Sequence, residues 1–142
     1  MSARRTAVEL EILSRMDSEG DLTETRLFVP GELTRLESGC MLRYRDPEGN
    51  CDTVLRISEN GQALIRRTGE FSGRIPVVPG EQAVFLYRTP YGDLELVSEG
   101  LELVLEKGDR AGEIRLRYRV VLPQGGTVSE NHIIIRYKES AN

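Results

Sequence analysis

The alternation of apolar and polar residues is clearest between Gly112 and Leu122. Apolar side chains occupy the even positions of this stretch, and charged ones occupy the odd positions as far as Arg119. A period of two places successive side chains on opposite faces of a strand, whereas a helix would spread the arginines around its circumference. The pattern predicts a β-strand with one buried face and one face in water.

The register of the next strand follows from the same pattern. Pro123–Gly126 is a turn signal, and pairing Leu122 with Thr127 across it fixes the partners of both strands. The expected outward pairs, which join opposite charges, are Arg119–Glu130 and Glu113–Arg136. The expected inward pairs are Tyr118–Asn131, Leu116–Ile133 and Ile114–Ile135. A slip of one residue would break both charge pairs and turn the isoleucines to water.

The strand before Gly112 is expected to bend. Its apolar residues fall on even positions as far as Leu96 and on odd positions from Leu101 to Leu105. A bulge near Glu99–Gly100 would absorb this shift of parity. The pairs expected with the following strand are Glu106–Glu113, Leu103–Leu116 and Glu102–Arg117.

Two further hairpins are expected in the first half of the chain. Cys40–Arg45 and Cys51–Ser58 flank the turn Asp46–Asn50, and the loop Glu59–Gly61 leads into Gln62–Thr68. The expected pairs are Leu42–Leu55, Tyr44–Thr53, Arg45–Asp52, Leu55–Ile65 and Thr53–Arg67. Other strands are expected at Val8–Ile12, Thr23–Leu36, Ile75–Val78, Ala83–Arg88 and Asp93–Glu106. Pro30–Gly31 predicts a kink or bulge inside the second of these.

The fold class that these strands predict is all-β. Roughly eight to ten antiparallel strands joined by short loops favour a closed up-and-down barrel, which removes exposed sheet edges. We expect a single barrel domain over residues 1–142, with a core of about residues 7–138 and short flexible termini. An immunoglobulin-type sandwich is the rival, but the chain has no Trp and no Cys pair at the inter-sheet spacing.

Composition restricts the partners and the compartment. The formal net charge of -4 argues against general binding to nucleic acid or to an anionic membrane. The N-terminus has no apolar segment of a secretory signal, and no apolar run reaches the roughly 20 residues of a membrane span. In the hairpin register Cys40 and Cys51 lie too far apart for a disulfide, as expected in a reducing compartment. We expect a cytoplasmic protein.

One block of residues resembles a known family. Leu86–Gly92 reads Leu-Tyr-Arg-Thr-Pro-Tyr-Gly and is followed by the Leu101–Leu105 strand, the Tyr118 strand and the Val128–Ile135 strand. Together these stretches look like the YwiB-like family of small bacterial proteins of unknown function. The resemblance covers nearly the whole chain, from Val8 to Glu139, and implies a lipocalin-like barrel of the calycin type. It implies no established activity and no catalytic residues.

The registers place Tyr44, Thr53 and Arg67 side by side on the inward face. An arginine inside an apolar barrel is costly unless it is paired, and an inward Arg and Tyr can hold a carboxylate ligand. The alternative is that Arg67 lies at a barrel mouth and extends into water. Tyr118 and Asn131 form either a structural pair or a ligand contact. The same ambiguity applies to Tyr87, Thr89 and Tyr91, because Thr-Pro-Tyr-Gly is first of all a turn.

Catalytic and metal-binding constellations are not found in the sequence. His132 is the only histidine and is expected to face outward opposite Arg117, without a nucleophile nearby. We therefore expect a non-enzyme without metal or cofactor. Four apolar residues also have outward parity and could form a homodimer or partner surface. They are Val97, Val104, Val121 and Ile134.

Two functions remain open at this point. The first is the binding of a small apolar or carboxylate-bearing ligand in a cavity of at least a few hundred Å³. That cavity would be lined by Tyr44, Arg67, Tyr87, Tyr118 and Asn131. The second is a protein-interaction module with a filled barrel and a contiguous outer patch around Val104 and Ile134.

Overall fold

The computed structural model describes residues 4–46 and 50–140, and this part of the chain forms ten β-strands. The middle of the expected turn Asp46–Asn50 lies outside the described residues. The strands are β1 Arg4–Ser18, β2 Asp21–Leu36, β3 Gly39–Asp46, β4 Cys51–Ser58, β5 Gln62–Gly69, β6 Ser72–Val77, β7 Gln82–Thr89, β8 Gly92–Lys107, β9 Ala111–Val121 and β10 Thr127–Glu139. No helix long and apolar enough to cross a membrane occurs among the described residues.

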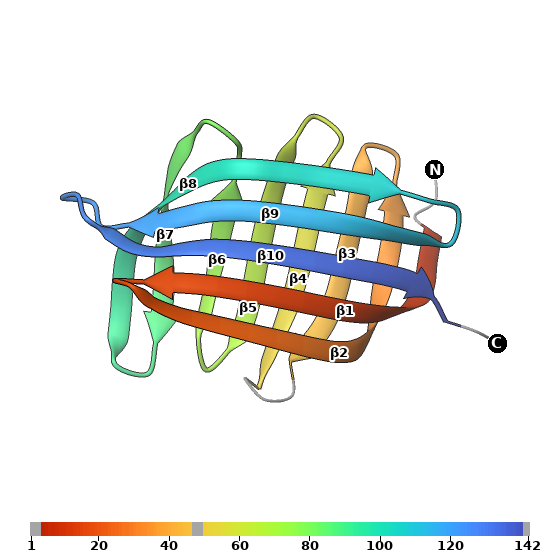
Figure 1. Cartoon of the computed structure of the whole chain (residues 1–142), viewed down its shortest axis with the longest axis horizontal. Coiled ribbons are helices and arrows are strands. Elements are labelled where there is room, and N and C mark those ends of the chain that lie inside the picture. The colour runs from red at the N-terminus through yellow and green to blue at the C-terminus, as the bar shows by residue number, and fades with distance from the viewer. Residues whose placement is uncertain (1–3, 47–49, 141–142) are drawn as a thin grey trace.

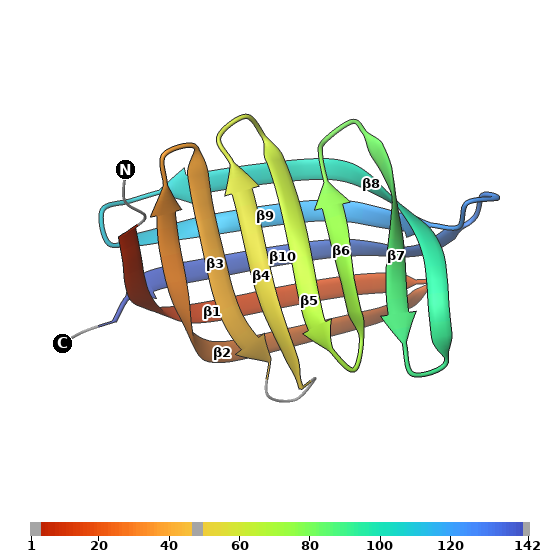
Figure 2. The same ribbon diagram turned by 180° about the vertical axis from the view of Figure 1, so that it is seen from behind.

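Each strand pairs with its neighbours in the sequence, and β1 pairs with β10 to close the barrel. The predicted antiparallel up-and-down barrel is therefore confirmed. The barrel is flattened into two layers (Figure 1). Strands β8, β9, β10, β1 and β2 run across the front, and β3 to β7 cross them behind (Figure 2). The long strands β1, β2 and β8 bend around the sides and belong to both layers.

The register of the three C-terminal strands agrees with the sequence pattern from Gly112 onward. All five predicted pairs from Arg119–Glu130 to Glu113–Arg136 are present, as are the three predicted pairs between β8 and β9. A bulge between Gly100 and Glu102 accounts for the change of parity in β8. The expected pair Leu122–Thr127 is wrong, because Thr127 faces Val121 and a second bulge follows it.

The hairpins of β3, β4 and β5 also have the predicted register, including Tyr44–Thr53 and Thr53–Arg67. Strand β2 differs from the expected broken strand. It is paired with β1 from end to end without a register shift, so Pro30–Gly31 does not form a bulge. Gly31 instead allows close approach, since a Cβ there would lie 2.7 Å from Leu10 Cδ1 and 2.9 Å from the Arg43 carbonyl oxygen.

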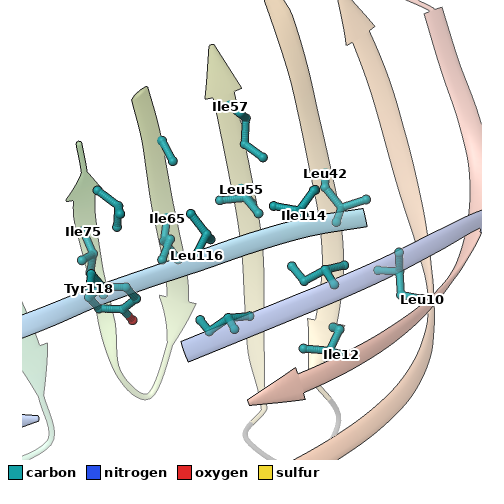
Figure 3. Packing of buried hydrophobic residues seen from close by; sticks show 14 of the residues in the cluster. Leu10, Ile12, Leu42, Leu55, Ile57, Ile65, Ile75, Ile114, Leu116 and Tyr118 are labelled. Atoms are coloured by element: carbon teal, nitrogen blue, oxygen red, sulfur yellow. The ribbon is translucent and has the colours of Figure 1, made fainter. Parts of the chain in front are cut away.

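The centre of the barrel is filled by aliphatic side chains from both layers (Figure 3). One cross-strand row on the rear layer consists of Leu33, Leu42, Leu55, Ile65 and Ile75, all buried. The front layer contributes Ile12, Ile114, Leu116, Ile133 and Ile135. Burial of this apolar surface provides the main stabilisation of the fold.

The seam between β6 and β7 is the weakest of the ladders in the described chain. It contains two residue pairs, Ser72–Arg88 and Gly73–Tyr87. Ser98 of β8 compensates for the missing ladder bonds. Its hydroxyl is buried and donates to the Pro76 carbonyl oxygen at 2.6 Å, and it lies 3.5 Å from the Ala83 carbonyl oxygen. One side chain thus joins β6 and β7 through a third strand.

Replacing Ser98 by alanine is expected to lower the free energy of unfolding by about 1–3 kcal/mol, because the Pro76 carbonyl would lose its hydrogen bond in a buried site. Urea unfolding followed by circular dichroism measures the change. Ser38→Ala, in an exposed turn, is the control and should stay within about 0.5 kcal/mol. Equal stability of the two variants would contradict a bridging role for the Ser98 hydroxyl.

Candidate functional site

A row of polar side chains crosses the inner face of the rear layer next to the aliphatic row. Tyr44, Thr53 and Arg67 are consecutive cross-strand partners on β3, β4 and β5. The row continues through Gly73 to Tyr87 on β7. The alternation of the strands sends these side chains to the inside of the barrel, as the sequence predicted. The polar row lies between the filled centre and the end of the barrel that carries the β5–β6 turn.

Gly73 makes room for Tyr87 beside Arg67. A Cβ on Gly73 would lie 2.7 Å from Tyr87 Cδ1, so the tyrosine ring covers this backbone position. The ring also stacks on Phe71 of the β5–β6 turn, with a centroid distance of 6.1 Å and an interplanar angle of 23°. Phe85 meets Tyr87 edge-on at 6.5 Å. The aromatic groups therefore form a continuous wall from the interior to the surface.

The surroundings of Arg67 keep a positive charge inside the barrel. Burial by itself lowers the pKa of its guanidinium, but Tyr118, Tyr87 and Tyr44, with a hydrogen bond to the Tyr87 hydroxyl, give a net rise in that pKa. Arginine is in any case charged at all physiological pH values. None of the ion pairs found among the described residues includes Arg67. Its closest electrostatic neighbours are thus tyrosine hydroxyls.

Two of these tyrosines are themselves perturbed by the site. Burial raises the pKa of Tyr44, and the charge of Arg67 and a hydrogen bond with Thr53 offset part of that rise. Burial likewise raises the pKa of Tyr118, which Arg67 again partly offsets. Both hydroxyls therefore remain protonated at neutral pH and can each donate one hydrogen bond.

A pocket of about 260 Å³ opens beside this row, between the two layers of the barrel. We call it the mouth pocket. The rear layer and its turns contribute Tyr44, Thr53, Arg67, Phe71 and Tyr87, and the front layer contributes Ile12, Ser14, Thr25, Arg26 and Leu27. Arg26 is already paired with Glu11 at 3.1 Å. Asp46 and Cys51, at the outer end of the β3–β4 hairpin, complete its edge. The mouth pocket thus combines a half-buried cation, hydroxyl groups and apolar walls.

The structure separates the sequence-predicted site residues into three groups. Tyr44, Thr53, Arg67 and Tyr87 line the mouth pocket. Tyr118 acts on Arg67 from the front layer without lining the pocket.

The remaining predicted residues lie elsewhere. Asn131 faces Tyr118 in the register, but its side-chain amide donates to the Ser129 hydroxyl at 3.0 Å. Thr89 accepts a hydrogen bond from the Tyr91 amide and donates to the Gly92 carbonyl, so its role is to shape the β7–β8 turn. Tyr91 is 96% exposed. The expected cavity lined by Tyr118 and Asn131 is therefore replaced by a pocket at the barrel end.

Several lining residues were not foreseen from the sequence. Ile12 and Leu27 had the apolar alternation of strands, but nothing in the sequence indicates that their layer faces the polar row. Phe71 follows directly after Gly69–Glu70 in a segment without regular alternation. A large aromatic residue in a short turn next to an inward arginine is the one signal that could have identified it.

Both cysteines are free. Cys40 is buried, and this burial raises the pKa of its thiol. Cys51 is half-buried and lies at the edge of the mouth pocket. They occupy opposite ends of the β3–β4 hairpin, opposite Ile57 and Asp46 respectively. The two thiols therefore differ in access to a reagent in solution, and Cys51 can report on occupancy of the pocket.

A larger and more open hollow of about 1030 Å³ lies on the outer surface of β1, β2, β9 and β10. Most of its charged residues form ion pairs with one another, while Lys107 pairs with Glu59 outside the hollow. Arg136 pairs with Glu11 at 3.2 Å and with Glu113 at 2.9 Å. Lys138 lies 3.8 Å from Glu9. Charges that already form ion pairs have less to offer an anionic ligand than Arg67, for which no ion pair is found among the described residues, so the smaller mouth pocket is the better candidate site.

His132 faces Arg117 as expected, and Arg15 lies on its other side. Its Nε2 is buried without a hydrogen-bond partner among the described residues. No group of three or more His, Cys, Asp or Glu side chains suited to a metal ion occurs in residues 4–46 and 50–140.

The four outward apolar residues do not share one patch. Val97 and Val121 are adjacent, beside the exposed Val84. Arg115 lies between Val104 and Ile134. The contiguous surface expected around Val104 and Ile134 is thus interrupted by a charge.

The comparisons with known proteins agree with this description. A family model described as a domain of unknown function, DUF1934, matches residues 10–135. None of the curated proteins matches the chain. The crystal structure of the ywiB protein from Bacillus subtilis is similar over 96% of this chain and 94% of that chain, with a TM-score of 0.81 and 19% identity. The resemblance indicated by the Leu86–Gly92 block is confirmed, and at this identity the structural match speaks for the fold alone.

Proposed function

Because the chain belongs to the DUF1934 family, which is described only as a domain of unknown function, we propose a function from its own geometry: binding of a small carboxylate-bearing ligand in the mouth pocket. The observation that carries this proposal is Arg67, an inward arginine whose neighbours are hydroxyl groups and whose side chain borders a pocket. Arg67 is half-buried, and an arginine withdrawn from water usually has an anionic partner. A ligand anion would provide that partner.

The donors around the pocket suit a carboxylate. The planar guanidinium offers two parallel N–H groups, which match the two oxygens of a carboxylate. The Tyr44 hydroxyl, which also lines the pocket, can donate to the same anion. Asp46 lies at the outer end of the pocket and already has an interaction in the protein. Repulsion from Asp46 would therefore favour a ligand anion at the inner end, next to Arg67.

We propose a binding protein and not an enzyme. The only histidine of the chain, His132, lies on the outer face and does not line the mouth pocket. The pocket residues can orient and neutralise an anion, which requires no proton transfer. Tyrosine hydroxyls with raised pKa values act as hydrogen-bond donors and are poor general bases at neutral pH.

Replacing Arg67 by methionine is expected to weaken the binding of benzoate by about 10- to 100-fold, since the bidentate, charge-assisted hydrogen bonds are lost while the apolar volume is kept. Isothermal titration calorimetry with benzoate, acetate and pentanoate measures the effect. Arg66→Met is the matched control. Arg66 is the exposed neighbour on the same strand, and its removal should leave affinity unchanged.

A second readout uses the thiols. Benzoate should slow the alkylation of Cys51 by iodoacetamide in the wild type and not in the Arg67→Met variant, because Cys51 borders the occupied pocket. If none of the three acids shows saturable binding up to about 10 mM, the proposed function is overturned. A dissociation constant of that size corresponds to a binding free energy of only about 3 kcal/mol. Equal binding of benzoate and uncharged benzamide would also contradict a site built around a charge.

A further inference from the structure

We propose that the mouth pocket is specific for a flat aromatic carboxylic acid. Its carboxylate would lie inward on Arg67, and its ring would lie in the slot between the Phe71–Tyr87 pair and the aliphatic side chains of Ile12 and Leu27. This inference rests on the proposed function and adds to it the chemical class of the ligand.

The orientation follows from a gradient of burial along the pocket. Thr53 is 4% exposed, and Arg67 is its cross-strand partner at the same level of the barrel. Phe71, in the β5–β6 turn, is 40% exposed and marks the outer end. Thr53 and the half-buried Arg67 therefore lie further in than Phe71, with the buried Ile12 at their depth in the opposite layer, and the exposed Phe71 lies nearest to solvent. A ligand with one anionic end and one apolar end satisfies this arrangement only with its anion inward.

The shape of the slot follows from the two layers of the barrel. Ile12 and Leu27 are cross-strand partners on β1 and β2 in the front layer. Phe71, in the β5–β6 turn, and Tyr87, on β7, belong to the rear layer, whose strands cross the front layer (Figures 1 and 2). Both pairs line the same pocket. The rings of Phe71 and Tyr87 are nearly parallel, at 23°. A planar ring can therefore contact an aromatic wall on one side and aliphatic groups on the other, as in the interior of a protein.

The depth of the slot at Tyr87 depends on Gly73, because only a residue without a side chain leaves room for the Tyr87 ring there. Because the Tyr87 ring covers Gly73, it stays close to the sheet and keeps its hydroxyl directed at Arg67. The volume of about 260 Å³ is slightly smaller than the roughly 300 Å³ at which sites for drug-sized ligands begin. The pocket therefore suits a single ring with one carboxylate.

The test compares benzoate with cyclohexanecarboxylate, which has the same number of heavy atoms and the same charge but is not flat. Calorimetric titration of the full-length protein should show benzoate binding about two- to tenfold more tightly, because only the planar ring stacks on Phe71 and Tyr87. Phe71→Leu should remove this preference while keeping an apolar side chain at a half-exposed position that the fold tolerates. Tyr87→Phe keeps the ring and should retain the preference.

The outcomes separate the two proposals. If the wild type binds the two acids with equal affinity and the Arg67→Met variant binds neither, the aromatic specificity is overturned and the carboxylate site is supported. A preference for benzoate that persists in Phe71→Leu would also overturn the assigned role of the aromatic wall. Binding of neither acid would overturn both proposals. Circular dichroism spectra of the variants that match the wild type establish that each loss belongs to the pocket and not to the fold.

Discussion

Replacing Gly100 by alanine is expected to lower the free energy of unfolding by about 3 kcal/mol or more. A Cβ at this position would lie 2.2, 2.4 and 2.7 Å from the carbonyl oxygen, carbonyl carbon and amide nitrogen of Val78. These are backbone atoms, so no rotation of a side chain can relieve the collision. Gly100 also accepts a hydrogen bond from the Gly80 amide and donates one to the Glu81 carbonyl, at 3.0 and 3.1 Å. The substitution would therefore separate the β6–β7 connection from β8.

Urea unfolding of Gly100→Ala followed by circular dichroism measures this loss. Gly20→Ala is the control, because Gly20 has a φ of 86° and open space around its Cβ position. That variant is expected to lose only about 1 kcal/mol, from the left-handed backbone conformation. Similar losses in the two variants would show that Val78 can move away from Gly100, and that the seam depends less on this close approach.

Gly100 also shows why so much of the fold could be predicted from the sequence. The apolar residues of β8 change from even positions, ending at Leu96, to odd positions, starting at Leu101. This change required an extra residue in the strand, and the barrel has its bulge there. Alternation carries this much information because a strand has only two faces, and one of them must be buried. Cross-strand charge pairs such as Glu113–Arg136 then select one register among the alternatives.

The errors in register occur where backbone conformation decides the pairing. Leu122 does not face Thr127 because the turn contains two glycines with positive φ, Gly125 at 102° and Gly126 at 103°. Such a turn admits several lengths, and the apolar pattern does not distinguish them. At Gly31 the missing side chain accommodates a close approach of Leu10, which depends on packing between strands and not on the pattern along one strand.

The candidate site could be predicted only within one layer. The registers correctly placed Tyr44, Thr53 and Arg67 next to one another, because cross-strand partners follow from counting along a hairpin. Whether the space beside these residues is empty depends on how far away the opposite layer lies. The sequence pattern along one strand does not determine the distance between the two layers. Leu33, Leu42 and Leu55 show the consequence: their row is as inward as the polar row, yet it is fully packed.

Raising the pH above about 10 is expected to unfold the barrel, because Tyr118 is buried and Tyr44 half-buried as neutral phenols. Burial raises the pKa of both hydroxyls in the folded state. The unfolded chain therefore releases these protons at a lower pH than the folded chain. The stability that the two neutral hydroxyls contribute is complete below pH about 10, and it is lost as the pH rises towards their pKa values in the folded state. Burial raises the pKa of Tyr137 as well, which acts in the same direction.

The expected slope gives this prediction a quantitative test. Each group that ionises only in the unfolded chain removes about 1.4 kcal/mol of stability per pH unit, so Tyr44 and Tyr118 together remove about 2.7 kcal/mol per pH unit. The Tyr137 hydroxyl and the Cys40 thiol, whose pKa values burial also raises, add to this slope. Urea unfolding at a series of pH values above 10 measures the slope, and Tyr118→Phe should reduce it by about 1.4 kcal/mol per pH unit, whatever its effect on stability at neutral pH. Tyr91→Phe, at a position 96% exposed, should leave the slope unchanged. The prediction is contradicted if the tyrosinate absorbance rises for all five tyrosines while the β-sheet signal in circular dichroism persists. The tyrosines would then ionise inside the folded barrel. Arg67 would stabilise their anions, much as we propose that it stabilises a ligand carboxylate.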